Sequence, residues 1–97
     1  MTGRPDRLDR NRSKVVLYGA EGCHLCERAR ATVVEVQQEL GFELEEVAID
    51  GDAELESRYR ELIPVVEIDG KQEFVYFVDP AALRRALAQT RGSEGTL

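Results

Sequence analysis

Apolar residues follow two different spacings along the chain. A short continuous run, Lys14 to Tyr18, is rich in β-branched residues and has the length of a buried strand. In the segment that follows, apolar residues recur instead at steps of three and four, the spacing of an amphipathic helix. The expected apolar face of this helix consists of Cys26, Ala29, Val33, Val36 and Leu40. The segment Glu27 to Leu40 is therefore predicted to be a helix, and Gly41 is a natural C-terminal stop.

The middle of the chain predicts a second strand and a short helix. Phe42 to Ile49 reads as a strand whose alternation slips between Leu44 and Val47, which favours an edge strand with a bulge. Asp52 is placed to cap the short helix. Its expected apolar face consists of Leu55, Tyr59 and Leu62.

The rest of the chain predicts a hairpin and a closing helix. Val65 to Ile68 and Glu73 to Val78 read as two strands joined at Asp69-Gly70, a tight-turn dipeptide. Asp79-Pro80 has the form of an N-cap followed by the first helical residue. The last helix then has Leu83, Ala86 and Leu87 on its apolar face.

These elements predict an α/β domain of order βαβαββα, with a four-stranded mixed sheet and helices on both faces. The domain is expected to span residues 14–91. Residues 1–13 are polar and show no period, and we expect them to form a disordered tail. Residues 92–97 are expected to be a polar C-terminal tail.

Composition narrows the classes of function. Of 97 residues, 42% are hydrophobic and 33% charged, which is ordinary for a globular protein, and no apolar run is long enough to cross a membrane. The first residues contain no apolar segment of the kind found in secretory signals, so we expect a cytoplasmic protein. The net charge is −6, and because the first fourteen residues carry five basic and two acidic side chains, the remainder carries −9. An acidic body argues against nucleic acid as the partner, and we expect no membrane partner.

Both cysteines and the only histidine lie in the segment Gly22-Cys23-His24-Leu25-Cys26. A Cys-x-x-Cys at a strand-to-helix junction is typical of a redox site. The helix start favours an anion, so we expect the pKa of the Cys23 thiol to lie below its ordinary value and its thiolate to be reactive. Cys26, one turn on, is close enough to form a disulfide with Cys23.

Other interpretations of these residues stay open. The two cysteines could be an inert disulfide or buried thiols, or could supply two ligands to a metal, although a closed zinc site needs four. An iron–sulfur cluster shared across a dimer is a further alternative. His24 is either a solvated side chain or an imidazolium that stabilises the Cys23 thiolate.

From Val15 to about Leu87 the chain resembles the small glutaredoxin-like proteins. The resemblance rests on the Cys-x-x-Cys segment, on Ile63-Pro64-Val65-Val66 after Tyr59, and on the closing Val78-Asp79-Pro80. It implies a thioredoxin-like fold in which Cys23 is the nucleophile and Cys26 the resolving thiol. It also implies a cis-proline at Pro64 and a substrate contact through the backbone of Ile63. Without the resemblance, Pro64 would be read as a helix terminator with a trans bond, because only about 5–6% of such bonds in folded proteins are cis.

Two positions depart from the glutaredoxin pattern. Glutaredoxins typically carry a lysine three residues before the first cysteine, where this chain has Ala20. They also carry a glycine pair where glutathione docks, and here the substrate-binding positions are Val78 and Asp79. Glutathione is therefore the less expected partner, and an external dithiol electron donor is favoured.

The sequence thus predicts a glutaredoxin-like thiol–disulfide oxidoreductase that reduces protein or mixed disulfides by a dithiol mechanism. Its expected partners are a disulfide-containing protein or a small thiol substrate, and we expect a monomer without metal or organic cofactor. The alternative is a non-catalytic thioredoxin-fold binding module, or an iron–sulfur or metal carrier that uses Cys23 and Cys26.

Overall fold

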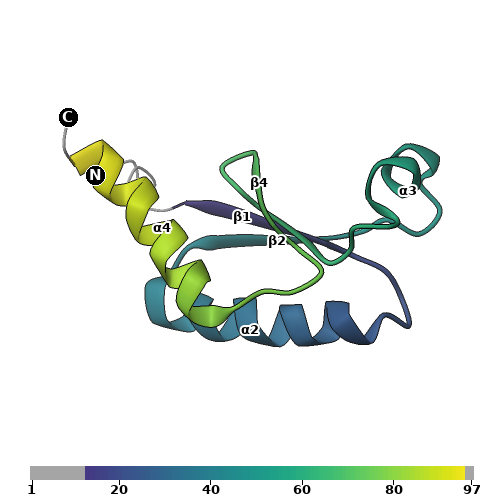
Figure 1. The fold of residues 1–97 in the computed structure, drawn as a ribbon, viewed down its shortest axis with the longest axis horizontal. Coiled ribbons are helices and arrows are strands. Elements are labelled where there is room, and N and C mark those ends of the chain that lie inside the picture. Colours follow the sequence, from purple (N-terminus) through teal and green to yellow (C-terminus); the bar gives the residue numbers. More distant parts are fainter. Residues whose placement is uncertain (1–12, 96–97) are drawn as a thin grey trace, which may run out of the picture.

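The computed structural model describes residues 13–95, which form one sheet with three helices (Figure 1). The order βαβαββα is the predicted one. Its elements are β1 Lys14–Gly19, α2 His24–Leu40, β2 Glu43–Ala48, α3 Ala53–Tyr59, β3 Val65–Ile68, β4 Lys71–Val75 and α4 Pro80–Gly95. None of the helices in this range is long and apolar enough to cross a membrane.

The four strands form one mixed sheet in the order β2-β1-β3-β4. β1 pairs in parallel with β2 and antiparallel with β3, so it is a central strand. β3 and β4 form the antiparallel hairpin. Asp69 and Gly70, both at positive φ, make the predicted tight turn between them. The central position of β1 matters for the site because this strand leads directly into the cysteine segment.

The sheet is covered on both faces, as predicted. Alternate residues of β3 point to opposite sides: Val66 and Ile68 belong to the main core, and Val65 belongs to a second cluster. The main core is formed with α2 and α4. In Figure 1, α2 runs beneath the sheet, and α4 begins beside α2 and rises toward the upper left. α3 contributes Leu55 and Tyr59 to the second cluster on the other face.

The long helix α2 is confirmed, with two corrections to its predicted extent. It begins at His24, three residues before the predicted start, because Cys23 acts as its N-cap. Four of the five predicted face residues are buried, but Leu40 is 37% exposed, because the last turn projects past the sheet. The helix ends where Gly41 adopts the left-handed conformation (φ 78°), and the Gly41 N–H bonds to the carbonyl of Gln37.

The predicted bulge lies in a different strand. β2 is an edge strand, but it pairs with β1 residue for residue from Glu43 to Ala48, so the bulge predicted there is wrong. The irregularity instead falls in the hairpin, where Val66 pairs with Phe74 but Glu67 pairs with Gln72, leaving Glu73 as the extra residue. Local alternation could not locate it, because a bulge depends on which residues face one another across the strands.

The returning strand was also misplaced. β4 starts directly after the two-residue turn, at Lys71, and ends at Val75, whereas the prediction placed it at 73–78. The ladder stops because Tyr76 adopts a positive φ of 69° and Phe77 follows it in a loop. The apolar run Phe74 to Val78 therefore divides between a strand and a loop.

Both predicted N-caps agree with the structure, but α3 ends at Tyr59, so Leu62, predicted on its apolar face, lies beyond the helix. Asp52 caps α3 by accepting hydrogen bonds from the N–H groups of Glu54 and Leu55, each 3.1 Å long. Asp79 caps α4 by accepting from the Ala82 N–H at 2.9 Å. α4 continues to Gly95, so the predicted C-terminal tail begins inside this helix. Of the predicted N-terminal tail, residues 1–12 lie outside the described residues, and the carbonyl of Ser13 accepts from Glu43 N–H.

Candidate active site

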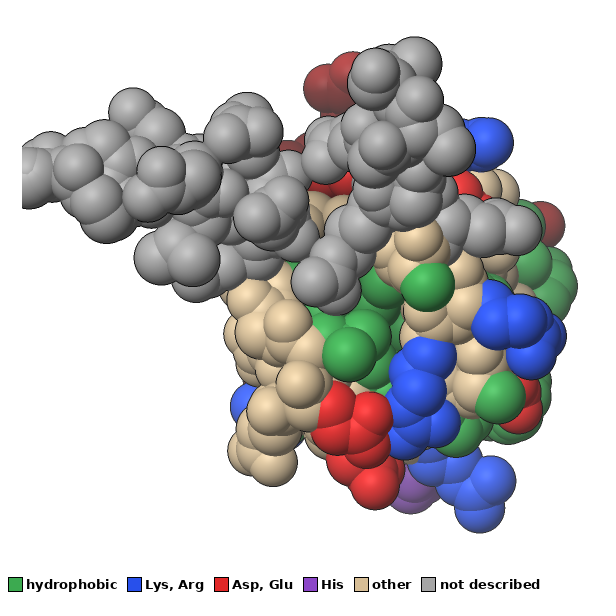
Figure 2. All heavy atoms as spheres, turned by 90° about the vertical axis from the view of Figure 1, so that its left-hand side faces the viewer, with side chains coloured by type: hydrophobic (Ala, Val, Ile, Leu, Met, Phe, Trp, Pro, Cys, Tyr) green, Lys and Arg blue, Asp and Glu red, His purple; other side chains and the backbone are tan. Residues whose placement is uncertain are grey.

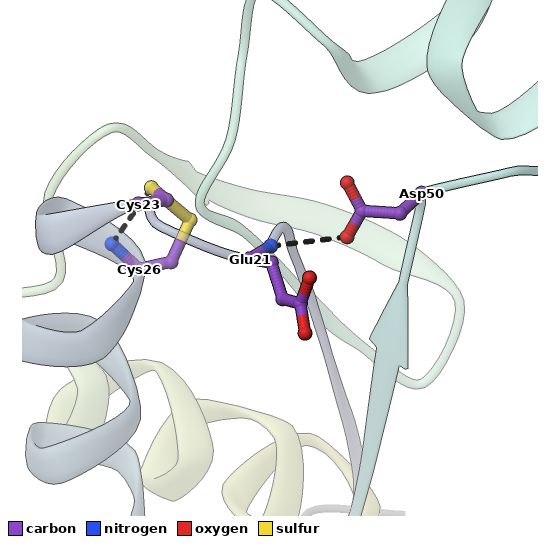
Figure 3. Close-up of a disulfide and its surroundings, with 4 residues drawn as sticks. All are labelled: Glu21, Cys23, Cys26 and Asp50. Atoms are coloured by element: carbon purple, nitrogen blue, oxygen red, sulfur yellow. Dashed lines mark hydrogen bonds between the residues drawn. A yellow bond between two sulfur atoms is a disulfide. The ribbon is translucent and has the colours of Figure 1, made fainter.

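Cys23 and Cys26 form a disulfide at the start of α2, with their Cα atoms 5.2 Å apart (Figure 3). Cys23 is the N-cap, in an extended conformation, and its sulfur accepts a hydrogen bond of 3.1 Å from the Cys26 N–H. Its carbonyl accepts the first helical bond, from Glu27 N–H, at 3.1 Å. Cys23 is therefore held beside N–H donors that the helix leaves unpaired, which are suited to stabilising a thiolate.

The two sulfur-bearing side chains differ in accessibility. Cys23 is half-buried, whereas Cys26 is only 8% exposed and lies in the buried row of α2 with Ala29 and Val33. A substrate disulfide can therefore approach Cys23 more easily than Cys26. This asymmetry is the one that a nucleophile and an internal resolving thiol require.

The loop before Cys23 is fixed at both ends. Ile49 N–H donates to the Gly19 carbonyl at 2.9 Å, and Glu21 N–H donates to Asp50 Oδ2 at 3.0 Å (Figure 3). Both bonds join the end of β1 to the segment after β2. The position of the cysteine segment is thus set by the parallel pair of strands that precedes it.

Gly19 lies directly against Cys26, a close approach that the sequence analysis missed. A Cβ placed on Gly19 would lie 3.2 Å from Cys26 Cβ and 3.3 Å from Cys26 Sγ. The absence of a side chain lets the start of α2 approach the end of β1. The sequence signal was the single glycine that ends an otherwise apolar strand.

Ile63 and Pro64 lie on the same end of the molecule as the disulfide. Their peptide bond is cis, as the resemblance implies. Ile63 is half-buried and lines a groove that Cys23 also lines, so the structure brings these two predicted residues together. Pro64 is fully buried, and its carbonyl accepts from Tyr76 N–H at 2.9 Å.

The backbone of Ile63 is only partly available for a substrate. Its N–H already donates to the carbonyl of Tyr59 at 3.0 Å. Within residues 13–95 we find no hydrogen bond to the Ile63 carbonyl. Of the two groups that could pair with an extended substrate segment, the carbonyl is therefore the one left open.

The groove beside Cys23 carries several charges. Three acidic residues, Glu21, Asp50 and Glu56, and one basic residue, Arg60, line it. Arg60 and Glu56 form an ion pair at 3.8 Å. Sequence analysis missed these residues as a group, because they come from separate loops and from α3.

A second hollow lies on the other side of the disulfide, beside Cys26. Its apolar lining includes Leu17 of β1, Val47 of β2 and Ala20 in the loop after β1. Arg30 and Glu46, which also line it, are joined by an ion pair of 2.8 Å between α2 and β2. Glu21 and Glu27 complete its charged lining, so Cys26 borders a hollow of mixed apolar and charged character.

Val78 and Asp79, predicted as substrate-binding positions, have structural roles here. The Val78 side chain is 3% exposed and packs in the main core. Asp79 is exposed at the N-cap of α4. The residues just before them were missed: Tyr76 is 50% exposed and Phe77 is 67% exposed. Tyr76 is bonded to the Pro64 carbonyl, which places this pair next to the proline loop.

A polar network supports the proline loop from the α3 side. The rings of Tyr18 and Tyr59 are stacked, with centroids 4.2 Å apart. Tyr59 Oη donates to Glu67 Oε2 at 2.8 Å, and Tyr18 Oη donates to Glu67 Oε1 at 3.5 Å. Burial is the main cause that raises the pKa of Tyr18 to about 12, with contributions from Tyr59 and Glu67. Because Tyr18 precedes the cysteine loop and Tyr59 precedes the proline loop, the stack joins the two halves of the site.

His24 is the first residue of α2 and is exposed. Within residues 13–95 no hydrogen bond or ion pair involves its imidazole. The same part of the chain contains no group of three or more His, Cys, Asp or Glu side chains arranged to hold a metal ion.

Comparison with known proteins agrees with this geometry. The sequence model of the glutaredoxin-like domain (DUF836) matches residues 14–88, nearly the whole described chain. This chain belongs to the glutaredoxin-like domain family. An uncharacterised protein of Mycobacterium tuberculosis is 29% identical over 85 residues, covering 82% of this chain and 88% of that protein.

Solved structures place this glutaredoxin-like protein in the same fold. It is similar to protein Ne2328 from Nitrosomonas europaea (TM-score 0.66, 36% identity, covering 77% of this chain and 91% of that one). It is also similar to XcR50 from X. campestris (TM-score 0.67, 31% identity, 77% and 96% covered). Fasciola hepatica thioredoxin shares the fold at 21% identity, with a TM-score of 0.57 and 89% of each chain covered. A thioredoxin-like fold with paired cysteines at the start of its long helix supports a redox-related role.

Proposed function

We propose that this protein is a thiol–disulfide oxidoreductase that reduces protein or mixed disulfides by a dithiol mechanism. The observation that carries the proposal is the arrangement of the two cysteines. Cys23, the accessible one, caps α2, and Cys26, the buried one, is bonded to it within one helical turn. The groove that joins Cys23 to Ile63 gives a substrate segment a place to lie.

The reaction begins from the reduced protein. The Cys23 thiolate attacks one sulfur of the substrate disulfide, forms a mixed disulfide and releases the other sulfur as a thiolate, which takes a proton from water. Cys26 then loses its proton to solvent and attacks Cys23 Sγ. This second step releases the remaining substrate thiolate and leaves the Cys23–Cys26 disulfide. Two electrons pass from the protein to the substrate, and an external dithiol returns them.

Each part of the site has a task in this scheme. The N–H of Cys26, which bonds to Cys23 Sγ at 3.1 Å, favours the charged form of Cys23 before attack. Burial keeps Cys26 away from outside disulfides, so that it reacts with the sulfur one turn away. The open carbonyl of Ile63 accepts a backbone N–H of the bound segment. In this proposal the site works in the cytoplasm, without a metal or organic cofactor.

Two matched variants test the assignment of the cysteines. Cys26→Ser is expected to accumulate a mixed disulfide with the substrate, because nothing remains to resolve it. Cys23→Ser is expected to lose exchange altogether. Mass spectrometry of each reduced variant after reaction with hydroxyethyl disulfide distinguishes the two. A stable adduct on Cys26 of Cys23→Ser, formed as fast as on Cys23 of Cys26→Ser, would contradict the proposal.

Alkylation of the reduced wild-type protein gives an independent measurement. We expect Cys23 to react first with iodoacetamide, with a midpoint on the pH axis below the ordinary cysteine value of about 8.5. Peptide mapping identifies the labelled residue. Labelling of Cys26 first would reverse the two roles.

A further inference from the structure

The groove beside Cys23 contains more negative than positive charge. Three acidic residues, Glu21, Asp50 and Glu56, and one basic residue, Arg60, line it, so the formal charge of its lining is −2. On the face opposite the start of α2, acidic and basic side chains lie next to one another (Figure 2). A substrate disulfide that approaches Cys23 therefore meets a net negative charge in this groove.

Two of the carboxylates are held in place by the backbone around the site. Asp50 accepts from Glu21 N–H at 3.0 Å, and Figure 3 shows Glu21 between the disulfide and Asp50. Glu56 accepts from Gly51 N–H at 3.0 Å. Glu56 also pairs through its other oxygen with Arg60, at 3.8 Å. Asp50 and Glu56 are thus held in position before a cation approaches, whereas Glu21 is exposed and lines the same groove.

We propose that these carboxylates select disulfides that carry positive charge next to the reacting sulfur. The inference rests on the proposed function and names its substrate class. It does not depend on the acidic residues alone, because the groove is defined by the reactive Cys23 and by the open carbonyl of Ile63. Glu21, Asp50 and Glu56 are specificity-determining residues for that site, and Arg60 acts against them.

Physical reasoning gives the size and the salt dependence of the effect. Exposed charges interact over a screening length of about 8–10 Å at physiological ionic strength. Glu21 is two residues from Cys23, and the other carboxylates line the same groove, so a cation on the atoms flanking the substrate sulfur falls within this range. In water such contacts change a rate by only a few-fold for each charge. The selectivity is thus expected to be moderate and to fall as salt is added.

The chemical reaction is the thiol–disulfide exchange described under the proposed function, and it needs no further reactant. Pre-reduced protein supplies both electrons in a single turnover: the Cys23 thiolate breaks the substrate S–S bond, and Cys26 closes the protein disulfide. The released thiols each gain one proton from solvent. Charge selection acts on the approach to the first step.

The first experiment compares three small disulfides of similar length that differ in charge. Cystamine is a dication, hydroxyethyl disulfide is neutral, and dithiodipropionate is a dianion. Their single-turnover rates with the pre-reduced protein are divided by their rates with mercaptoethanol, which removes the difference in intrinsic reactivity. We expect the corrected rate to be highest for cystamine and lowest for dithiodipropionate, and the ratio to shrink at high salt.

Variants identify the residues responsible. Glu21→Gln/Glu56→Gln keeps the acceptor oxygens and removes two charges, so the cystamine preference should fall by about threefold to tenfold. The matched control Glu43→Gln/Glu73→Gln removes two exposed charges outside the groove and should retain the preference. Arg60→Gln should increase it. Circular dichroism and thermal melting check that each variant is folded, and the single variants Glu21→Gln and Glu56→Gln replace the pair if it unfolds.

Two peptide disulfides distinguish a protein substrate from a small molecule. They are homodimers of a short peptide with one cysteine, flanked by lysines in one case and by glutamates in the other. Faster reaction of the lysine peptide assigns the preference to basic protein segments, and a preference confined to cystamine assigns it to small cationic disulfides. Equal corrected rates for cystamine and dithiodipropionate, or an equal loss in the control variant, would overturn the inference. Failure to react even with hydroxyethyl disulfide would instead overturn the proposed function.

Discussion

Gly19 and Cys26 lie so close together that a side chain on the glycine would make an unusually tight contact. A Cβ at position 19 would be 3.2 Å from Cys26 Cβ and 3.3 Å from its sulfur. Cys26 is held by the disulfide and by the first turn of α2, so it cannot easily move away. We predict that Gly19→Ala lowers the free energy of unfolding by about 1 kcal/mol, because overpacking outweighs the entropy that alanine removes from the unfolded chain. Urea unfolding of the oxidised protein measures it.

A double-mutant cycle separates this contact from a general backbone effect. In the reduced protein, Cys26→Ala removes the sulfur and leaves only the Cβ contact. The cost of Gly19→Ala should then be smaller than in reduced wild type, which gives a coupling between the two positions. Additive effects would show that the contact is not the cause.

The hydrogen bond from Tyr59 to Glu67 is predicted to stabilise the loop that carries Pro64. Tyr59 is 4% exposed and its hydroxyl donates to a carboxylate at 2.8 Å. Tyr59→Phe should cost about 1.5–3 kcal/mol of unfolding free energy, the range for bonds to charged groups. Tyr18→Phe should cost less, because its contact with Glu67 is 3.5 Å long. The control is Tyr76→Phe, which removes an exposed hydroxyl; a loss as large as that of Tyr59→Phe would contradict the prediction.

The same network predicts a stability change at high pH. Burial raises the pKa of Tyr18 from 10.0 to about 12, so in the unfolded chain this phenol ionises first. Its contribution to stability is therefore fully present below pH 10 and is lost as the pH rises toward 12. We expect wild type to lose more stability than Tyr18→Phe over this interval. Urea midpoints of both proteins across the interval provide the measurement, and parallel curves would exclude the assignment.

Much of this fold follows from local patterns. The spacing of Ala29, Val33 and Val36 predicted the helix, and Asp69-Gly70 predicted the turn, because each depends on neighbours in sequence. The bulge at Glu73 and the exposure of Leu40 depend on what lies across the sheet or at its edge, and these predictions failed. Val78 shows the same limit, since an apolar residue in a strand-like run gave no sign that it belongs to the core after the strand has ended.

The residues of the candidate site also differ in how far local sequence could predict them. Cys23 and Cys26 were found because their spacing itself expresses the chemistry. Glu21, Asp50 and Arg60 were not, because they meet only when the loop before α2, the turn after β2 and the end of α3 are brought together. A charged groove assembled from three segments has no signature in any one of them.

His24 is predicted to make the disulfide slightly more oxidising. Its imidazole is exposed at the first position of α2, beside Cys23. A protonated imidazole favours the thiolate over the uncharged disulfide, so His24→Ala should shift the potential to more negative values. Redox titration against glutathione or dithiothreitol buffers tests this, with His24→Gln as a neutral control; a more positive potential in His24→Ala would contradict it.

The last prediction concerns the electron donor: glutathione should serve poorly, and a protein dithiol should serve better. Glutathione is a net anion at neutral pH, and the groove beside Cys23 has a formal charge of −2. Ala20 stands where glutaredoxins typically carry a lysine, so a charge-assisted contact is absent. Losing one such contact costs about 1.5–3 kcal/mol, which corresponds to roughly a tenfold to hundredfold loss of affinity.

The positions where glutaredoxins carry a glycine pair, Val78 and Asp79, favour the same result. Val78 packs in the core, so Asp79 alone adds an unfavourable charge, and it is fixed as the N-cap of α4. The assay follows reduction of the Cys23–Cys26 disulfide by glutathione with its reductase, and by thioredoxin with its reductase, at equal ionic strength. Ala20→Lys should improve the rate of reduction by glutathione. The control is Glu43→Lys at the far end of β2, which adds at least as much positive charge and should not improve that rate. Saturation of the wild type by glutathione at a few millimolar or less, at the rate of the thioredoxin arm, would establish a glutathione-dependent enzyme instead.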